Sequence, residues 1–576
     1  MNEHSRPAPE RPWLKSYPPG IDWHAPISTR PVHEKVRDVC ARQPEMPALD
    51  FLGRVTRYGE LGRQIDALAG ALQADLGVAK GDRVALLMPN TPFYVVAYYA
   101  LLSIGAIVVN CNPLYSRDEL AHVVANSGAR VLVTVDLRLT FESAEHLAAT
   151  GPVETLVVAR FADALPVATA MMFRLAKGKT LAKPERSPVV SRVVWFADLL
   201  ARKRVPAPVA IDPAADIAVQ QYTGGTTGIP KGAMLSHANI AANTDQIDKW
   251  GGTLFYAPSR VAAVLPFFHI FAMTTSLNAP LGSGGQVIML PRFEMGPFLK
   301  LLRRTRPHVM SAVPTLLHAL ATSPKCTSDH LSSLRVAVSG GAPLPDETRD
   351  AFARKSSAIL GEGYGLTEAS PVVTCAPLDK PSKRGSIGLP FPGTDVKFMD
   401  LEAPDTELPL GERGQIVVKG PQVMLGYFDD PDATRAAFTP DGYLRTGDVG
   451  YVDADGFVFL VDRIKDLIIS SGFNVYPRMI EDAIYKHDAV DETCVIGVKD
   501  TYRGEIPVAY VKLKEGQSLA AEDLITFLRA RLSKLEMPRE IIFRDELPKT
   551  MIGKLSRTDL RADYERTKRP EEGMGT

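Results

Sequence analysis

One glycine- and threonine-rich stretch gives the strongest indication of fold class: Tyr222-Thr223-Gly224-Gly225-Thr226-Thr227-Gly228-Ile229-Pro230-Lys231-Gly232. Its three inner glycines let backbone N–H groups turn toward an anion, its threonines add hydroxyl donors, and Lys231 adds a positive charge. A Walker loop needs Gly-Lys-Ser/Thr at the start of a helix, whereas here Ile229-Pro230 precedes the lysine and Gly232 follows it. The stretch therefore predicts a polyphosphate-binding loop of another kind, with a glycine-rich surface turn as the alternative.

Length and charge limit the class of protein. The chain has 576 residues, several times the usual domain length, so two or more hydrophobic cores are expected. Lysine plus arginine (66) equals aspartate plus glutamate (66), so no overall field attracts nucleic acid. A polyanion must be held by local chemistry, and we expect no nucleic-acid partner.

The five cysteines are far apart in the sequence and form no Cys-x-x-Cys pair. This spacing argues against a zinc site or a disulfide framework and favours a reducing cytoplasm. The stretch 84–116 is uncharged, and its largely apolar part 93–109 is close to the length of a membrane span, but prolines precede that part and Gly105 interrupts it. We interpret it as a buried helix, a turn and a buried strand.

Strand-like and helical runs alternate through the first half of the chain. The expected strands are 83–88, 107–109, 130–135, 155–158, 261–266, 286–290, 309–313 and 334–339. Such alternation predicts layered α/β structure with mainly parallel sheets. Beyond about Gly385 short strands with frequent glycine and proline predict a small antiparallel barrel or sheet, and from about Asp462 a compact pattern predicts a separate domain with helices at 477–487 and 522–533.

Residues 164–190 form a less regular segment. Met171-Met172-Phe173 is followed by Arg174, Lys177, Lys179 and Lys183. The mixture fits contact with an anionic lipid surface. We favour a solvated insertion, because charge runs usually face water.

Four further segments place polar or small residues where an apolar core would not need them. Ser339-Gly340-Gly341-Ala342-Pro343-Leu344 follows a strand, at the end where α/β sheets bind ligands. Gly361 to Glu368 offers the Tyr364 ring, the Thr367 hydroxyl and the Glu368 carboxylate, which suit a base and a magnesium ion. Tyr443 to Asp448 places an acid at a turn, and Leu547 to Lys554 places a lysine on a glycine-containing loop.

With these segments in this order, the chain resembles the acyl-adenylate-forming superfamily of acyl-CoA synthetases, luciferases and peptide-synthetase adenylation domains. The likeness runs from about Pro12 to Lys568. The 222–228 stretch, Asp462-Arg463-Ile464-Lys465-Asp466 and Ser471-Gly472-Phe473-Asn474-Val475-Tyr476-Pro477 look most like bacterial long-chain fatty-acid CoA ligases. The early segments Lys80 to Leu86 and Val109 to Tyr115 agree with this resemblance.

The resemblance implies an α/β fold with two domains. A large N-terminal domain of layered α/β sheets plus a small β-barrel would span 1–464. A small, mobile α+β domain would span 465–576 and carry the catalytic lysine, with Lys465 as its hinge.

It also implies an ATP-dependent acyl-CoA ligase acting on medium- or long-chain fatty acids. Attack of the carboxylate on the ATP α-phosphate would give acyl-AMP and pyrophosphate, and coenzyme A would then displace AMP. ATP, Mg²⁺ and CoA are the implied cofactors and cosubstrates. A ligase for dicarboxylic or aromatic acids, or one that loads a carrier protein, stays as an alternative. Peripheral contact with the inner membrane surface and a homodimer also stay open.

Residue roles follow from the same resemblance. Lys554 would contact the substrate carboxylate and ATP, Glu368 and Thr223 would hold magnesium, and Thr367 would bind the α-phosphate. The β- and γ-phosphates would bind to Thr223, Gly224, Gly225, Thr226, Thr227, Gly228 and Lys231. Tyr364 would stack on adenine, while Asp448 and Arg463 would bind ribose. The other residues expected around the nucleotide are Gly340, Gly341, Ala342, Pro343, Glu362, Gly363 and Gly365.

Two further expectations concern the acid and the thiol. His269, in Pro266-Phe267-Phe268-His269-Ile270-Phe271, matches the aromatic motif beside the reacting carboxylate, although a lone histidine in an apolar stretch is more often a core residue. Domain rotation would withdraw Lys554 and bring Ser471 and Gly472 to the site, where small side chains admit pantetheine. Gln415, Ile552 and the 535–538 segment depart from the usual pattern, the last by losing a positive charge.

Overall fold

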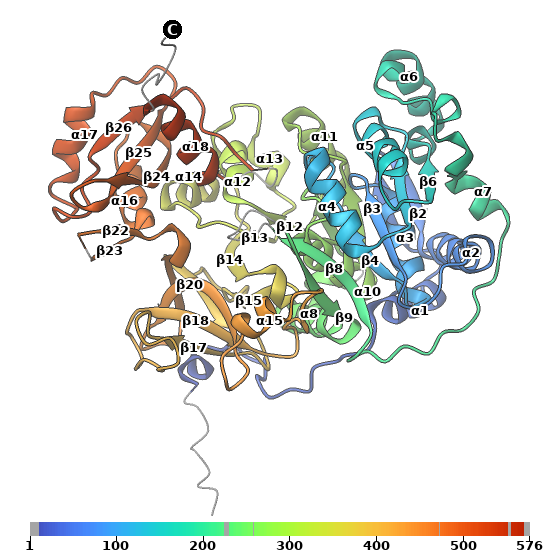
Figure 1. The fold of residues 1–576 in the computed structure, drawn as a ribbon, viewed down its shortest axis with the longest axis horizontal. Coiled ribbons are helices and arrows are strands. Elements are labelled where there is room, and N and C mark those ends of the chain that lie inside the picture. The colour runs from blue at the N-terminus through green and yellow to red at the C-terminus, as the bar shows by residue number, and fades with distance from the viewer. Residues whose placement is uncertain (1–10, 224–229, 257, 472, 551–553, 569–576) are drawn as a thin grey trace, which may run out of the picture.

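The computed structural model describes residues 11–223, 230–256, 258–471, 473–550 and 554–568. Three sheets organise these residues: one of eight strands, one of thirteen and one of five. The first two belong to the large N-terminal part and the third to the small C-terminal part (Figure 1). The predicted α/β class is confirmed.

The eight-stranded sheet carries the phosphate-loop candidate. Its order is β19 (Gly426–Tyr427), β9 (Lys231–Ser236), β8 (Ile217–Thr223), β4 (Ile107–Asn110), β3 (Arg83–Leu87), β5 (Val131–Val135), β6 (Thr155–Ala159) and β7 (Val193–Trp195). Pairing from β8 to β7 is parallel, while β9 runs antiparallel to β8. The predicted strands in this half of the chain are therefore present, with parallel pairing as expected.

Helices that accompany this sheet begin and end at recognisable signals. They are α1 (Val32–Arg42), α2 (Tyr58–Leu76), α3 (Pro92–Ser103), α4 (Arg117–Ser127), α5 (Arg138–Thr150), α6 (Val167–Lys177) and α7 (Phe196–Ala201). Ser116 caps α4 by accepting from the Glu119 N–H, while the Glu119 carboxylate accepts from the Ser116 N–H. The uncharged stretch that resembles a span is α3 followed by a turn and β4, all largely buried, as predicted. Within the described residues, no helix has the length and apolar character needed to traverse a membrane.

The thirteen-stranded sheet joins a parallel part to an antiparallel part. Its order is β17 (Asp395–Met399), β18 (Gly414–Lys419), β20 (Leu444–Val452), β21 (Val458–Arg463), β16 (Ser386–Pro390), β15 (Val372–Cys375), β14 (Ile359–Gly365), β13 (Val336–Gly340), β12 (Val309–Ala312), β10 (Arg260–Ala263), β11 (Gln286–Met289), β1 (Pro47–Phe51) and β2 (Arg54–Arg57). Strands from β14 to β1 pair in parallel. The helices in residues 237–437 are α8 (His237–Gly251), α9 (Ile270–Ala272), α10 (Ala279–Gly282), α11 (Met295–Thr305), α12 (Pro314–Thr322), α13 (Ser328–Leu331), α14 (Asp346–Lys355) and α15 (Pro431–Ala437).

The expected small barrel is seen as an open antiparallel extension of this sheet. Strands β17, β18, β20 and β21 follow one another by antiparallel pairing, and β21 continues into β16 and the large sheet. Strand β17 forms the end of the order. The extension places Asp448 of β20 and Arg463 of β21 side by side, next to the parallel strands that end at the candidate site.

The small C-terminal part has its own sheet and its own hydrophobic clusters. The strands are β22 (Ile468–Ser470), β23 (Phe473–Val475), β24 (Val490–Asp500), β25 (Gly504–Leu513) and β26 (Glu540–Phe543). Helices α16 (Pro477–Tyr485), α17 (Ala521–Leu528) and α18 (Arg557–Lys568) accompany them. The buried residues of its two clusters all lie between Ile468 and Leu560. In Figure 1 this part lies at one end of the molecule, opposite α6 and α7.

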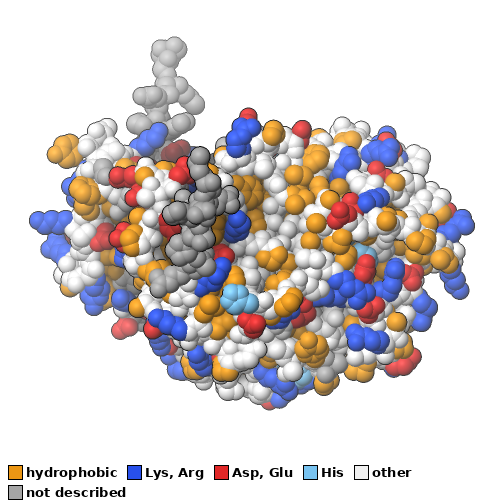
Figure 2. All heavy atoms as spheres, turned by 90° about the horizontal axis from the view of Figure 1, so that it is seen from below, with side chains coloured by type: hydrophobic (Ala, Val, Ile, Leu, Met, Phe, Trp, Pro, Cys, Tyr) orange, Lys and Arg blue, Asp and Glu red, His pale blue; other side chains and the backbone are white. Residues whose placement is uncertain are grey.

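Surface charge agrees with the balanced composition. Figure 2 shows basic and acidic side chains interspersed over the face that it presents, with hydrophobic side chains between them. The five cysteines are buried and unpaired.

Candidate active site

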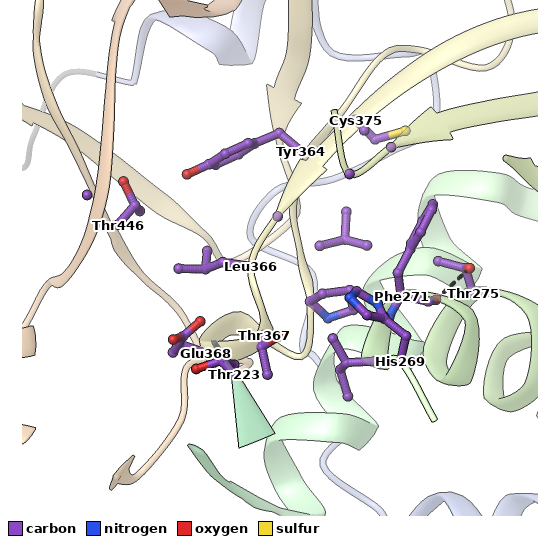
Figure 3. Close-up of a pocket in the computed structure, with 18 of the residues that line it drawn as sticks. Thr223, His269, Phe271, Thr275, Tyr364, Leu366, Thr367, Glu368, Cys375 and Thr446 are labelled. Carbon is purple, nitrogen blue, oxygen red and sulfur yellow. Dashed lines mark hydrogen bonds between the residues drawn. The ribbon is translucent and has the colours of Figure 1, made fainter. Parts of the chain in front are cut away.

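A cavity of about 670 Å³ lies where the two large sheets and the C-terminal part meet. The following residues of the predicted site line it: Thr223, Lys231, His269, Gly340, Gly341, Gly363, Tyr364, Gly365, Thr367, Glu368, Arg463, Lys465 and Lys554. Figure 3 shows Tyr364 and Thr446 on one side of it and His269, Phe271 and Thr275 on the other, with Thr223, Thr367 and Glu368 between and below them. Residues more than three hundred positions apart in sequence are thus brought together.

The phosphate-loop candidate begins and ends at this cavity. Thr223 closes β8 and pairs directly with Lys231, the first residue of β9. Lys231 Nζ lies 3.2 Å from Asp430 Oδ2, and 5.6 Å from the centre of the Tyr427 ring. The predicted contacts of Gly224, Gly225, Thr226, Thr227 and Gly228 fall outside the described residues.

The predicted ribose corner is held together by hydrogen bonds. Asp448 is buried; its Oδ2 accepts from the Tyr364 hydroxyl at 2.7 Å, and its Oδ1 lies 2.8 Å from Arg463 Nε. The charge of Asp448 raises the pKa of Arg463, so this guanidinium stays protonated. Asp448 itself stands behind the wall of the cavity, where it fixes two residues that do line it.

Lys554 enters the cavity from the C-terminal part. Gly341, with a φ of +82°, lies beside it: a Cβ atom on Gly341 would lie 3.1 Å from Lys554 Cε. Burial, together with the charge of Arg463, lowers the pKa of the Lys554 ammonium to about 8. A left-handed glycine without a side chain is what this close approach requires.

His269 lies at the other end of the cavity. It precedes the short helix α9, its Nδ1 accepts from the Phe271 N–H at 3.4 Å, and a π-helix (Met273–Asn278) follows. Burial and the nearby charge of Lys554 lower the pKa of His269 to about 4, so its ring is neutral at pH 7. The placement agrees with the predicted position beside a reacting carboxylate.

Beyond His269 the cavity becomes apolar. Its lining there includes Ile247 and Trp250 of α8, Phe255, Val309, Val338, Val372, Cys375, Leu378 and Phe391. The five cations of the lining are Lys231, Arg445, Arg463, Lys465 and Lys554. This combination gives one wall suited to anions and another suited to an apolar group.

Some predicted residues lie away from the cavity. Glu362 is buried beneath it, where its carboxylate accepts from Arg349 and, at 3.3 Å, from the Leu344 N–H. It therefore fixes the 340–345 turn from behind the cavity lining. Ala342, Pro343 and Ser471 also stand outside the lining, and Gly472 is outside the described residues.

Comparison with protein-family models shows to which family the chain belongs. Residues 36–428 match the AMP-binding enzyme model, and residues 479–554 match the AMP-binding enzyme C-terminal domain. The chain belongs to the AMP-binding enzyme family.

Relatives and solved structures extend over nearly the whole chain. The AMP-binding enzyme is 38% identical over 554 residues to a long-chain-fatty-acid–CoA ligase of Bacillus subtilis (strain 168), which covers 96% of this chain and 98% of that one. It is 35% identical over 551 residues to 4-coumarate–CoA ligase 2 of Oryza sativa subsp. japonica, covering 92% of each. ATP-bound MatB from Rhodopseudomonas palustris superposes with a TM-score of 0.82 and 29% identity, covering 93% of this chain and 99% of that chain.

The apo form of the same MatB gives a lower TM-score, 0.72, with 30% identity and the same coverage. Sequence does not explain this difference, since the identities are nearly equal. The N-terminal and C-terminal parts of this chain are thus arranged more like those of the ATP-bound relative than like those of the apo form. The position of Lys554 inside the cavity agrees with it.

Oxygen donors that suit magnesium lie at the phosphate end of the AMP-binding enzyme. Mg²⁺ binds through one or two carboxylates completed by water and substrate phosphates. Glu368 and the Thr223 hydroxyl are placed for such a site, and among the described residues no cluster of three or more His, Cys, Asp or Glu side chains offers an all-protein one. The residues therefore fit a magnesium ion that is held jointly with ATP.

Sequence reasoning missed Tyr427, whose hydroxyl donates to Glu368 Oε1 at 2.8 Å. It also missed Trp250 and Phe391 in the apolar wall, and Thr446 beside Tyr364. Gln415, noted only as a departure from the family pattern, lines the cavity. Tyr427 lies in the apolar run Val423-Met424-Leu425-Gly426-Tyr427-Phe428, which gives no sign of a partner for its hydroxyl.

Proposed function

We propose that this AMP-binding enzyme is an ATP-dependent acyl-CoA ligase for medium- or long-chain fatty acids. It converts the acid, ATP and CoA to acyl-CoA, AMP and pyrophosphate through an acyl-adenylate. The observation that carries the proposal is the entry of Lys554 into a cavity that is lined both by cations and by a cluster of apolar side chains. The full-length likeness to a bacterial long-chain-fatty-acid–CoA ligase supports it.

In the first half-reaction the substrate carboxylate lies between His269 and Lys554. The ammonium of Lys554 offsets the repulsion between the carboxylate and the α-phosphate, and neutral His269 leaves the carboxylate ionised and nucleophilic. Thr367 binds the α-phosphate, and the 223–231 loop with Lys231 holds the pyrophosphate that leaves.

The nucleoside end is held by the corner around Asp448. Tyr364 presents its ring to adenine and Arg463 binds ribose, while Asp448, behind the cavity wall, holds both side chains in place. The Tyr364–Asp448–Arg463 hydrogen bonds keep these groups in place before the nucleotide arrives. Magnesium, held by Glu368 and Thr223, supplies positive charge to the phosphates.

In the second half-reaction the C-terminal domain turns about Lys465. We take the boundary at 464/465, because the C-terminal hydrophobic clusters begin at Ile468 and the last strand of the large sheet in sequence, β21, ends at Arg463. Rotation withdraws Lys554 and brings Ser471 and Gly472 to the cavity. Ser471 lies outside the cavity in the present arrangement, as a two-position account requires.

The apolar wall favours a fatty acid over a dicarboxylate. A second buried carboxylate would need a cation, and the five lining cations stand at the nucleotide end. The rice relative keeps an aromatic acid as the second candidate, since Trp250, Phe255 and Phe391 would also accept a flat ring.

The test is AMP release in the presence of CoA across acids of rising chain length, with aromatic and dicarboxylic acids for comparison. Each added methylene should tighten binding by about 0.8 kcal/mol, roughly fourfold in KM, until the pocket is filled. Release with an aromatic acid alone would support the second candidate. Release with none of them would contradict a CoA ligase, and transfer to a carrier protein in place of CoA would support the carrier-loading alternative.

Peripheral contact with the inner membrane surface belongs to the same proposal. Helix α6 packs Ala170 and Phe173 against the core, with the Phe173 ring 5.3 Å from that of Phe161. Its other side exposes Val167, Met171 and Leu175, spaced four residues apart, and Met172 beside them. Residues 164–190 hold five basic side chains and one acidic one. The segment that carries the apolar face therefore has a net positive charge, which complements anionic lipid.

Flotation with phosphatidylglycerol vesicles tests this contact, with phosphatidylcholine vesicles for comparison. Met171→Glu should abolish flotation, whereas Tyr502→Glu, at an even more exposed residue of the C-terminal part, should not. Flotation that survives Met171→Glu, or does not depend on lipid charge, contradicts the contact. A homodimer remains a prediction, which sedimentation velocity tests.

A further inference from the structure

We propose that Tyr427 is a positioning residue, whose hydroxyl orients the Glu368 carboxylate toward the magnesium–ATP complex. This inference rests on the proposed function. It assigns a role to a residue of β19, which the sequence motifs of the site do not contain.

The segment around Tyr427 is fixed to both parts of the phosphate end. The Met424 N–H donates to the carbonyl of Glu368 at 2.8 Å, and the Phe428 N–H donates to the carbonyl of Gly232 at 2.8 Å. Between them, Gly426 and Tyr427 pair with Met234 and Ala233 of β9. Tyr427 is therefore held in register with the strand that leaves the phosphate loop.

Its side chain contacts the expected metal ligand directly. The Tyr427 hydroxyl donates to Glu368 Oε1 at 2.8 Å, and among the described residues Glu368 Oε2 has no hydrogen-bond partner. A carboxylate held at one oxygen keeps a single orientation and presents its other oxygen to the cavity that Glu368 lines. Without the hydroxyl, the carboxylate gains other rotamers.

A cation lies over the ring of the same side chain. Lys231 lies near the Tyr427 ring and pairs with Asp430 Oδ2 at 3.2 Å. Asp430 is itself fixed, because its Oδ1 accepts from the Ala433 N–H at 2.8 Å as the cap of α15. Tyr427 thus stands between the anion and the cation that the phosphates need, and each has its own anchor in the same segment.

Tyr427→Phe separates positioning from packing, because it removes the hydroxyl and keeps the ring. The matched control is Tyr17→Phe, which removes a tyrosine hydroxyl that donates to the carbonyl of Pro390, away from the cavity. Both full-length variants are compared with the unmodified protein by thermal unfolding and by calorimetric titration with ATP. Titrations are made once with MnCl₂ and once with EDTA.

We expect Tyr427→Phe to weaken binding of manganese–ATP by about tenfold and binding of metal-free ATP by less than about twofold. Tyr17→Phe should leave both unchanged. Equal affinity of Tyr427→Phe and the unmodified protein for manganese–ATP overturns the inference. So does an equal loss for both forms of ATP, which would indicate packing. If the unmodified protein binds neither manganese–ATP nor metal-free ATP, the result contradicts the proposed function as well as the role of Tyr427.

Discussion

His318 Nε2 lies 3.1 Å from Asp491 Oδ1, and this contact joins α12 of the N-terminal part to β24 of the C-terminal part. His318 Nδ1 lies 3.4 Å from the Thr348 hydroxyl, which is placed to donate to it. Hydrogen bonding to His318, then to Lys512, lowers the pKa of Asp491 to about 2. A carboxyl whose pKa is depressed on folding stabilises the folded state fully at pH values above its unfolded pKa, which is about 4. That stabilisation is lost as pH falls through 2. The contact therefore links the two parts in the arrangement that places Lys554 in the cavity.

His318→Ala should weaken that arrangement. A partly buried pair contributes about 1 kcal/mol, so we expect acyl-AMP formation to fall by roughly fivefold. Thioester formation from supplied acyl-AMP should be unchanged, because it uses the other arrangement. Arg544→Ala breaks an ion pair with Asp563 inside the C-terminal part and serves as the control. Equal losses in the two variants would show that the cross-domain position of His318 has no special effect.

Gly341→Ala should disturb the entry of Lys554. The added methyl group would lie 3.1 Å from Lys554 Cε, and alanine at a φ of +82° is strained in any case. We expect acyl-AMP formation to fall by about tenfold or more, with a smaller effect on ATP binding. Gly20→Ala, at a φ of +83° with open space around it, controls for backbone strain alone. A matching loss in that variant would contradict the steric argument.

The rate of adenylation should fall on the alkaline side. The pKa of Lys554 is lowered to about 8, so the ammonium is mostly present at pH 7 and disappears as pH rises through 8. The profile of kcat/KM for acyl-AMP formation should bend downward there. Lys554→Arg keeps a charge at high pH and should remove the bend, whatever its absolute rate. A profile that stays flat to pH 10 in the unmodified enzyme contradicts an essential ammonium at this position.

His269 should act as a neutral side chain. Its pKa is lowered to about 4, so its ring does not titrate between pH 5 and 7 and the rate should not change in that range on its account. His269→Ala should raise the KM for the acid by about tenfold while leaving the KM for ATP within about twofold. A larger effect on ATP would place the nucleotide, and not the acid, beside His269.

Much of the fold could be predicted because strands and helices leave local patterns. The parallel strands around 83–88 and 309–313, and the buried helix and strand within 84–116, follow from apolar runs bounded by glycine and proline. The antiparallel extension is predicted from the sequence only as a small barrel or sheet, because its strand order depends on pairing between distant segments. No local pattern specifies that pairing.

The site was predictable only where a motif carries its chemistry within a few residues. Glu368, Tyr364 and Lys554 fall in such motifs, and the fold brings them to one cavity. Glu362 belongs to the same motif, but β14 turns its side chain to Arg349, on the other side of the strand. The Tyr427 hydroxyl contacts Glu368, 59 positions away in the sequence, and His318 contacts Asp491, 173 positions away. No local sequence pattern indicates such contacts.

The most direct test measures the two half-reactions separately in Lys554→Ala. Acyl-AMP formation should fall by about a hundredfold or more, because the ammonium between carboxylate and phosphate is lost. Thioester formation from supplied acyl-AMP and CoA should stay at the level of the unmodified enzyme. Lys549→Ala, which removes a lysine of the same segment paired with Glu492, should preserve both. A comparable loss in both half-reactions of Lys554→Ala would contradict the account that Lys554 serves adenylation alone.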